Sequence, residues 1–526
     1  RVARGRSRHV LQSPVVRIAA LDLGSNSFHL LVADAHPDGT FEPLVREKEI
    51  LRLADNVTRN GRIGEETAAQ AVEVVRRFRT LAEAVDAREI VACGTSALRE
   101  AEDSAALVDR IEGEAGVRVD VISGKQEARL IFAAVRASVV IDPAPALALD
   151  LGGGSLELMI GDQLGLAWSK SVKLGVGRLT AELVRGDPPT PADRRRLARR
   201  LIAVLAPIAM EVESLSPEML VGSSGTLCAL IRMASARRTG TVPPSVNQLK
   251  VRSKDLLAVH EQIFELSAAE REKLPGIDAR RADLLPAGSM LLTTAMELFG
   301  LDELIGCEWA LREGIVLDAI GHHSQADWSG EPRNLRRESV DDLARRCNWQ
   351  ERHARQVARL AVDLFDGTAE LHGLGHHERD LLEHGALLHD IGEHVSIEGH
   401  DKHTAYLIQH GRLRGFAPDE VAVLASLGRF HRRGNPKLSF EPFASLPPAR
   451  RERVTKLIAL LRIADGLDRN HAGSVEGIGV KLEDQRVRLL IHATGDIDLE
   501  LWGLRRKREL FERVFDLPLE FEVVED

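Results

Sequence analysis

The sequence predicts a two-lobed α/β core, followed by an all-α helical domain and a small α/β C-terminal domain. An apolar strand ending at Asp22 runs through a Gly-Ser-Asn-Ser turn into a second apolar strand, and the same order recurs around Asp150. From about residue 330 the strand signals stop and helical spacing takes over, in a stretch that holds most of the 19 histidines. Strand signals return after about residue 470.

Length and composition agree with several globular domains. The chain has 526 residues, of which 44% are hydrophobic and 28% charged, and a domain usually holds roughly 100–200 residues. A net charge of −9 argues against nucleic acid as a partner. No apolar stretch reaches the ~20 residues that a membrane span needs, so no membrane partner is expected. The 4 cysteines form no CxxC pair, which fits a reducing compartment and predicts a cytoplasmic protein.

These signals divide the chain into five segments. A basic N-terminal arm over 1–16 precedes a first lobe over 17–140 and a second lobe over 141–325. A helical domain over 326–470 and a small α/β domain over 471–526 complete the chain.

The elements follow in order along each lobe. In the first lobe, a hairpin is expected over 17–32, a helix over 65–86, and strands over 89–93 and 117–122 that each lead into a helix. The second lobe and the last domain add further elements: strands 146–150, 156–160 and 219–221, then strands 475–482 and 487–493, a helix over 499–515 and a strand over 519–524.

Three glycine-containing turns predict a phosphate-binding site. Such turns leave backbone N–H groups free to face phosphate oxygens, with no side chain in the way. An aspartate at the end of the preceding strand can hold Mg²⁺ beside those phosphates. Purely structural loops are the alternative. The predicted phosphate-binding residues of the turns are Gly24, Ser25, Asn26, Ser27, Gly152, Gly153, Gly154, Ser155, Gly222, Ser224, Gly225 and Thr226.

The motifs DLGSNSFHLLV, DLGGGSLEL and GSSGT resemble the phosphate-binding elements of the actin/hexokinase/DnaK-type superfamily, with its duplicated ribonuclease H-like core. The form DLGSNS, with CGTSALREA at 93–101 and ISGKQEARLIF at 122–132, is similar to the exopolyphosphatase/guanosine pentaphosphate phosphohydrolase (Ppx/GppA) family. This resemblance covers roughly residues 17–320. Longer members of that family continue with a helical HD-type domain and a small C-terminal domain, which the rest of this chain resembles more loosely.

The resemblance implies roles for particular residues. Glu127 matches the family's presumed catalytic base, and its expected place in the first turn of a helix favours the ionised carboxylate. An ordinary capping role is the alternative. Asp22, Asp150 and Glu157 are the expected Mg²⁺ ligands, and Arg99 is expected to reach anionic oxygens or to lie on the surface. Lys173 and Arg178 are further candidates for contacts with phosphate. The arginine-rich run over 194–200 is interpreted as a solvent-exposed helix face or, alternatively, as a row of cations that binds polyphosphate.

A second constellation lies in the helical segment. The order His353, His389-Asp390 and Asp465 resembles the HD-domain phosphohydrolases, which implies a site for a transition metal such as Mn²⁺, Fe or Zn²⁺. His400, His403 and His431 could extend this site. The alternative is a structural remnant in which these groups bond only to each other and to nearby backbone.

The resemblance implies a Mg²⁺-dependent hydrolase that releases terminal orthophosphate from inorganic polyphosphate. Two alternatives stay open: hydrolysis of the 5′ γ-phosphate of pppGpp, and a non-catalytic regulator that binds polyphosphate or the alarmone. A kinase or chaperone of the superfamily is disfavoured, because a glutamate placed like Glu127 would activate water. The expected partners are polyphosphate or pppGpp, and the resemblance also implies a homodimer.

Overall fold

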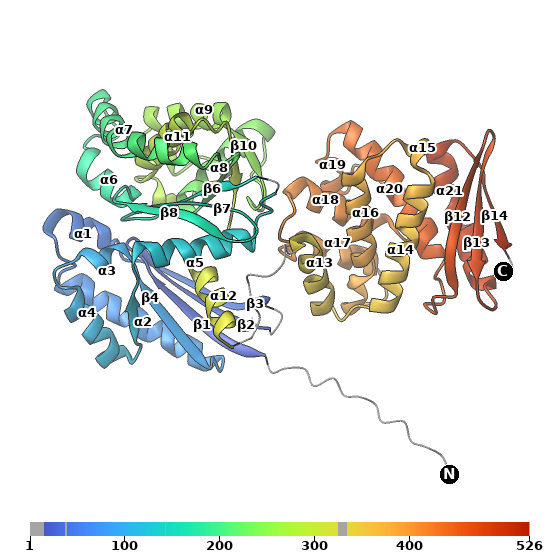
Figure 1. The fold of residues 1–526 in the computed structure, drawn as a ribbon, viewed down its shortest axis with the longest axis horizontal. Coiled ribbons are helices and arrows are strands. Elements are labelled where there is room, and N and C mark those ends of the chain that lie inside the picture. The colour runs from blue at the N-terminus through green and yellow to red at the C-terminus, as the bar shows by residue number, and fades with distance from the viewer. Residues whose placement is uncertain (1–14, 37–38, 143, 324–333, 525–526) are drawn as a thin grey trace, which may run out of the picture. The chain divides into compact units, whose positions relative to one another are not determined.

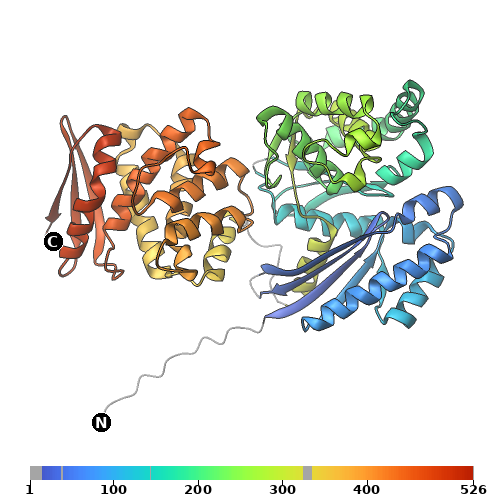
Figure 2. The same ribbon diagram turned by 180° about the vertical axis from the view of Figure 1, so that it is seen from behind.

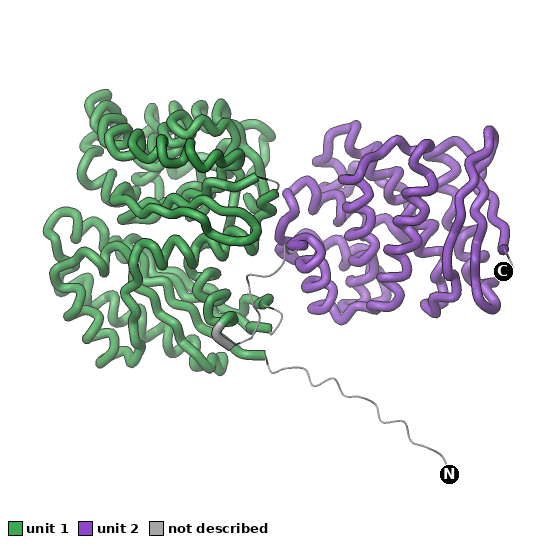
Figure 3. Tube along the Cα trace, viewed as in Figure 1, with its two compact units in different colours: residues 1–333 green, residues 334–526 purple. Residues whose placement is uncertain are grey.

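The computed structural model describes residues 15–36, 39–142, 144–323 and 334–524. The chain forms two compact units, residues 1–333 and 334–526 (Figure 3). Residues 1–14, which make up nearly all of the predicted basic arm, lie outside the described residues.

The first lobe of unit 1 contains a five-stranded sheet in the order β3-β2-β1-β4-β5. The first three strands are antiparallel, and β4 and β5 continue the sheet parallel to β1. The expected strand over 117–122 is shorter than predicted, because Gly116, at φ 64, ends a π-helical turn immediately before it. The strands are β1 (Val16–Leu23), β2 (Ser27–Ala35), β3 (Phe41–Ile50), β4 (Glu89–Gly94) and β5 (Val119–Val121).

The second lobe repeats this arrangement in a six-stranded sheet, in the order β8-β7-β6-β9-β11-β10. Again three antiparallel strands are followed by parallel neighbours, β9 and β11, and β10 adds an antiparallel edge. The repetition confirms the predicted two-lobed, duplicated α/β core. Its strands are β6 (Ala146–Leu151), β7 (Leu156–Gly161), β8 (Leu166–Val172), β9 (Met219–Ser223), β10 (Lys250–Arg252) and β11 (Glu303–Gly306).

Helices cover both faces of each sheet (Figures 1 and 2). Helix α2 packs on the outer face of the first sheet, whereas α5 and α12 contact its inner face or the second sheet. Because α5 and α12 contact each other, one apolar core joins the two lobes. The helices of unit 1 are α1 (Leu53–Asn60), α2 (Glu65–Ala84), α3 (Ser96–Glu100), α4 (Ser104–Arg110), the π-turn η1 (Ile111–Ala115), α5 (Gly124–Arg136), α6 (Val176–Leu183), α7 (Pro191–Ser214), α8 (Gly225–Thr239), α9 (Ser253–Glu265), α10 (Ala268–Arg271), the 3-10 turn η2 (Ala279–Arg281), α11 (Leu285–Phe299) and α12 (Leu311–His323).

Unit 2 is helical up to about residue 470 and ends in a three-stranded sheet with one more helix, as predicted. Leu457 and Phe511 belong to one apolar core, so the sheet and its helix pack onto the helical part. Among the described residues, no helix is both long enough and apolar enough to cross a bilayer. The elements are α13 (Leu335–Arg346), α14 (Glu351–Gly367), α15 (Ala369–His372), α16 (His376–Leu388), the 3-10 turn η3 (Ile391–His394), α17 (His400–His410), α18 (Pro418–Phe430), α19 (Glu441–Ala444), α20 (Pro448–Gly466), β12 (Val475–Glu483), β13 (Arg486–Ala493), α21 (Asp498–Phe515) and β14 (Leu519–Val524).

Candidate active site

The two predicted hairpin turns lie against each other in unit 1. A Cβ atom added to Gly153 would lie 2.8 Å from the Cβ of Asn26, and one on Gly154 would lie 2.9 Å from the Oγ of Ser25. Real Cβ atoms do not approach this closely, so glycine is what lets the two turns meet. The repeated motif of the sequence therefore forms a single site between the lobes.

Each turn is held in shape by its own hydrogen bonds. In the first, the Oγ of Ser25 accepts a bond from the backbone N–H of Ala97 at 2.9 Å, and the carbonyl of Asn26 accepts one from Arg52 N at 2.9 Å. In the second, Gly152 N donates to the carbonyl of Ser155 at 3.0 Å. Gly24 and Ser27 complete the first turn, where a Cβ on Gly24 would lie 2.8 Å from the Ser27 carbonyl oxygen.

The third predicted turn, Gly222 to Thr226, joins strand β9 to helix α8. Gly222 lies inside β9, where Leu304 and Leu227 occupy the space that a side chain would need. Ser224 has φ 83 and caps α8, its Oγ accepting from Leu227 N at 3.4 Å. Gly225 and Thr226 face the guanidinium group of Arg281, which donates to the Thr226 Oγ at 3.4 Å.

Four buried or partly buried carboxylates gather beside these turns. Asp22 lies at the end of β1, and Glu127 lies in the first turn of α5. Asp150 on β6 and Glu157 on β7 are opposite each other in the register of these two antiparallel strands. Burial, with added repulsion from Glu127, raises the pKa of Asp22 to about 8 and that of Asp150 to about 7. Burial, and the charges of Glu127 and Asp150, also raise the pKa of Glu157. Such a cluster of oxygen donors fits a hard divalent cation.

Glu127 does not cap its helix, although its position allowed that interpretation. Ser123 and Gln126 form the capping box of α5, with Gln126 Oε1 accepting from Ser123 N at 2.9 Å. Glu127 is only 6% exposed, and Arg99 donates to its Oε2 at 2.7 Å. Burial raises the pKa of Glu127, and the attraction of Arg99 opposes this.

The other predicted cations are paired with carboxylates of the chain. The Nζ of Lys173 and the Nη2 of Arg178 lie 2.8 and 2.9 Å from the Oε2 of Glu100. Arg194, in the arginine-rich run, lies on helix α7 and pairs with Glu261 at 3.0 Å.

A cationic group that the sequence did not reveal lies at the first and third turns. We call the three cations Lys48, Arg281 and Arg312, together with the neutral His29 that they surround, the cationic group; these four residues come from β3, η2, α12 and β2. Arg312 Nη1 lies 3.1 Å from His29 Nδ1, and the His29 Nε2 lies 2.8 Å from the Ser27 Oγ. Burial, with repulsion from the three cations, lowers the pKa of His29. These residues lie far apart in sequence, and no local pattern links them.

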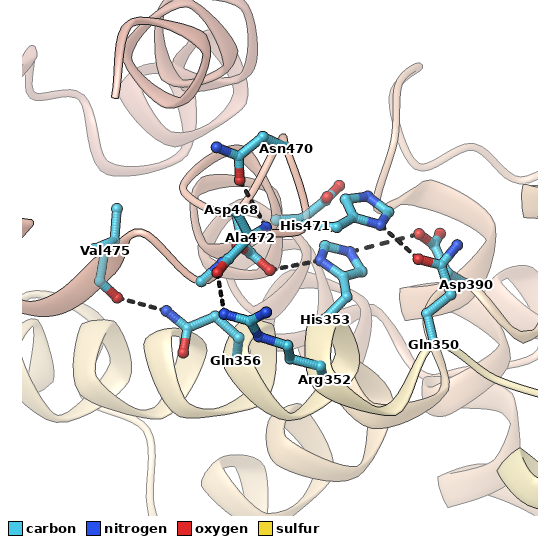
Figure 4. A network of polar contacts seen from close by, with 12 residues as sticks. Gln350, Arg352, His353, Gln356, Asp390, Asp468, Asn470, His471, Ala472 and Val475 are labelled. Carbon is cyan, nitrogen blue, oxygen red and sulfur yellow. Dashed lines mark hydrogen bonds and ion pairs between the residues drawn. The ribbon is translucent and has the colours of Figure 1, made fainter. Parts of the chain in front are cut away.

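The predicted HD residues also come together, in unit 2. His353, His389 and Asp465 offer ligand atoms within 4.8 Å of one another, and Asp390, His400 and His431 form a second such group. A third group comprises His353, Asp390 and His471, and within the described residues His403 belongs to none of the three. Three partners were missed: Asp468, whose Oδ2 lies 2.8 Å from His353 Nδ1 (Figure 4), His471, whose ring stacks on that of His353 with centroids 3.7 Å apart, and Lys507, which contacts Asp465. Asp468 follows Asp465 by three residues, a spacing that could have suggested it, whereas nothing local marks Lys507.

Comparisons with known proteins agree with this architecture. Exopolyphosphatase 1 of Mycobacterium tuberculosis is 35% identical over 317 residues, which cover 59% of this chain and 90% of that protein. Guanosine-5'-triphosphate,3'-diphosphate pyrophosphatase of Vibrio vulnificus is 27% identical over 484 residues, covering 90% of this chain and 92% of that protein. An exopolyphosphatase structure from Cytophaga hutchinsonii matches 58% of this chain and 98% of its own, with 29% identity and a TM-score of 0.55.

Two family models match successive parts of the chain. The model for the Ppx/GppA phosphatase family covers residues 31–323, and that for domain III of the same phosphatases covers residues 335–500. The first match spans the two lobes that hold the meeting turns and the four carboxylates, and it extends over more than half of the sequence. The chain therefore belongs to the Ppx/GppA phosphatase family.

Proposed function

We propose that unit 1 is a Mg²⁺-dependent hydrolase that removes terminal orthophosphate from inorganic polyphosphate. The observation that carries this proposal is the gathering of Asp22, Glu127, Asp150 and Glu157 beside two glycine turns in contact. The turns supply backbone N–H groups for phosphate oxygens, and the carboxylates supply sites for a cation and a base.

Asp22, Asp150 and Glu157 would hold the Mg²⁺. All three offer only oxygen, which Mg²⁺ prefers, and burial together with repulsion from neighbouring carboxylates raises their pKa values, a strain that a bound cation would relieve. When bound, Mg²⁺ neutralises charge on the phosphoryl oxygens during transfer.

Glu127 would act as the general base. Because Arg99 engages Oε2, Oε1 is the oxygen that can accept a proton from water. The raised pKa of Glu127 brings its basicity nearer to neutral pH. The water oxygen then bonds to the terminal phosphorus, the phosphoanhydride P–O bond breaks, and the shortened polyphosphate leaves as an oxyanion. The water proton passes to Glu127.

The cationic group supports a long polyanionic substrate. Lys48, Arg281 and Arg312 lie near enough to His29 to lower its pKa, at the first and third turns. Clustered cations attract repeated phosphates, and arginine binds phosphate oxygens through its forked N–H groups. The M. tuberculosis relative, which matches 59% of this chain, is named an exopolyphosphatase.

Hydrolysis of pppGpp is the second candidate. The V. vulnificus relative carries the name of that activity and matches the chain across both units. Both substrates end in a phosphoanhydride, so the same carboxylates and turns would serve either.

Phosphate release from long-chain polyphosphate and from pppGpp, each with Mg²⁺ and with EDTA, tests these proposals. We expect Mg²⁺-dependent release with a higher kcat/KM for polyphosphate. A higher kcat/KM for pppGpp would overturn the substrate assignment, and full activity in EDTA would overturn the role of Mg²⁺.

A further inference from the structure

Four buried histidines of unit 2 direct one ring nitrogen each toward a common centre. The Nδ1 atoms of His389, His400 and His431 lie 2.7, 3.0 and 2.8 Å from the carbonyl oxygens of the residues three positions earlier. A carbonyl can only accept a hydrogen bond, so each Nδ1 carries the proton. The Nδ1 of His353 likewise faces a carboxylate oxygen, that of Asp468, at 2.8 Å (Figure 4). In the neutral form of each of these rings, Nε2 therefore holds a lone pair.

These Nε2 atoms meet in two pairs. His353 Nε2 and His389 Nε2 are 3.2 Å apart, and His400 Nε2 and His431 Nε2 are 3.3 Å apart. Two lone-pair acceptors at this distance repel each other unless a proton or a metal ion lies between them. Histidines whose outer nitrogen bonds to a carbonyl or a carboxylate are typical metal ligands, since that bond orients the ring.

Asp390 lies between the two pairs. Its Oδ2 is 3.4 Å from His389 Nε2 and 3.7 Å from His353 Nε2, and its Oδ1 is 3.0 Å from His431 Nε2 and 3.4 Å from His400 Nε2. Oδ1 is buried and accepts no hydrogen bond from the described residues. A buried carboxylate oxygen without a donor is costly, and a cation would satisfy it.

We propose that unit 2 binds two divalent transition-metal ions bridged by the carboxylate of Asp390. His353, His389 and Asp465 hold one ion with Oδ2 of Asp390, and His400 and His431 hold the other with Oδ1. Lys507 contacts Asp465 through Oδ2, so Oδ1 of Asp465 is the oxygen left for the first ion. This proposal is independent of the function proposed for unit 1.

The donor set distinguishes this centre from the carboxylates of unit 1. Mixed imidazole and carboxylate donors favour Mn²⁺, Fe²⁺ or Zn²⁺ over Mg²⁺, which prefers oxygen alone. The second ion has only three protein ligands, a number that leaves coordination positions for water or an anionic oxygen.

Metal counting on the full chain tests the proposal. The protein is purified without chelators, stripped, reloaded with Mn²⁺ or Zn²⁺ in excess Mg²⁺, and freed of unbound ions before elemental analysis. We expect about two transition-metal ions per chain, and for Mn²⁺ an electron paramagnetic resonance spectrum of a coupled pair. Fewer than about 0.2 ions per chain in the wild type would overturn the proposal, because the nitrogen pairs would then share protons.

Single substitutions separate the two positions. His389→Ala and His431→Ala should each retain about one ion per chain, and Asp390→Ala should retain neither. His403→Ala, on the same helix as His400 but outside the cluster, and Asp150→Asn, in unit 1, should retain both. A wild type that holds one ion, lost in both histidine variants, would refute the two-ion centre. Circular dichroism checks that each variant folds. If Asp390→Ala does not fold, the number of transition-metal ions bound per wild-type chain still tests the proposal.

Discussion

Burial and the neighbouring Arg99 shift the pKa of the Glu127 carboxyl group in opposite directions. Burial raises its pKa, whereas the guanidinium of Arg99, 2.7 Å from Oε2, favours the charged form. Gln126, not Glu127, closes the capping box of the helix. Glu127 is therefore not needed as a cap, and its carboxylate is available for the proposed chemistry.

Replacing Glu127 by Gln should lower kcat for polyphosphate by ~10²–10⁴, because the amide cannot accept the proton of the attacking water. The measurement is orthophosphate release under saturating substrate. Glu66→Gln provides the matched control, since Glu66 is an exposed glutamate in the first turn of α2. A Glu127→Gln variant with more than about a tenth of the wild-type kcat would contradict the assignment of the base.

Asp150→Asn should raise the Mg²⁺ concentration needed for half-maximal activity, because the charge is lost while the shape is kept. In the wild type this concentration should also rise as the pH falls from about 8 to about 6. Protons then compete with the metal at Asp22 and Asp150, whose pKa values are about 8 and about 7. A Mg²⁺ titration that is identical in the variant and the wild type would place Asp150 away from the metal.

Without metal, the same pKa shift predicts a pH-dependent stability. The folded-state pKa of Asp150, about 7, lies above the ordinary value of 3.8, so its favourable contribution is present at low pH and is lost as the pH rises toward 7. Asn cannot ionise. Urea unfolding in EDTA should therefore show Asp150→Asn gaining stability relative to the wild type between about pH 4 and about pH 7, with little further change above that. A difference that stays constant with pH would show that Asp150 is not held protonated by burial.

At the scale of elements, close backbone approach decides how the turns are placed. A Cβ on Gly175, which precedes α6, would lie 2.3 Å from the carbonyl carbon of Gly154, in the turn between β6 and β7. Backbone atoms cannot yield as a flexible side chain can. The position of this turn against Asn26 therefore depends on Gly175 as well as on the glycines of the motif itself.

Gly175→Ala should destabilise unit 1 by about 1–3 kcal/mol and lower kcat/KM, because the turn must move to admit a methyl group. Urea unfolding and phosphate release measure the two effects. Gly165→Ala is the control, since a Cβ there has open space and the residue lies in the neighbouring β7–β8 hairpin. Equal stabilities of the two variants would show that the contact at Gly175 does not constrain the turn.

At the scale of the whole molecule, the chain has two units with separate apolar cores. The core of unit 2 extends from Val340 to Leu519 and combines the helices with the final sheet. The cores of unit 1 lie within residues 18–320. Each unit should therefore unfold as its own cooperative block.

Calorimetry of the full chain should show two thermal transitions. Mg²⁺ at millimolar concentration should raise the Tm of one, and Mn²⁺ or Zn²⁺ should raise the Tm of the other in the presence of Mg²⁺, because each ion binds only a folded site. Asp150→Asn should remove the first shift and Asp390→Ala the second. A single transition that both kinds of metal move together would contradict the independence of the two units.

The sequence by itself determined the features that depend on local pattern. The paired turns at Asp22 and Asp150 repeat one motif, and alternating strands and helices indicated the two lobes that the sheets confirm. Edge strands β3 and β8 were missed, because their half-exposed residues lack a clear apolar run. The family resemblance, which the domain models confirm, supplied the roles proposed for Glu127 and the metal ligands.

Only the tertiary structure decided which charges meet. In the folded chain Arg99 contacts Glu127, and Lys173 and Arg178 both contact Glu100. The residues of the cationic group lie together although they come from four separate elements. The tertiary structure also brought His400 and His431 to Asp390 while leaving His403 outside. Such contacts depend on how elements far apart in the chain pack together, and the spacing of residues along one helix or strand carries no information about that packing.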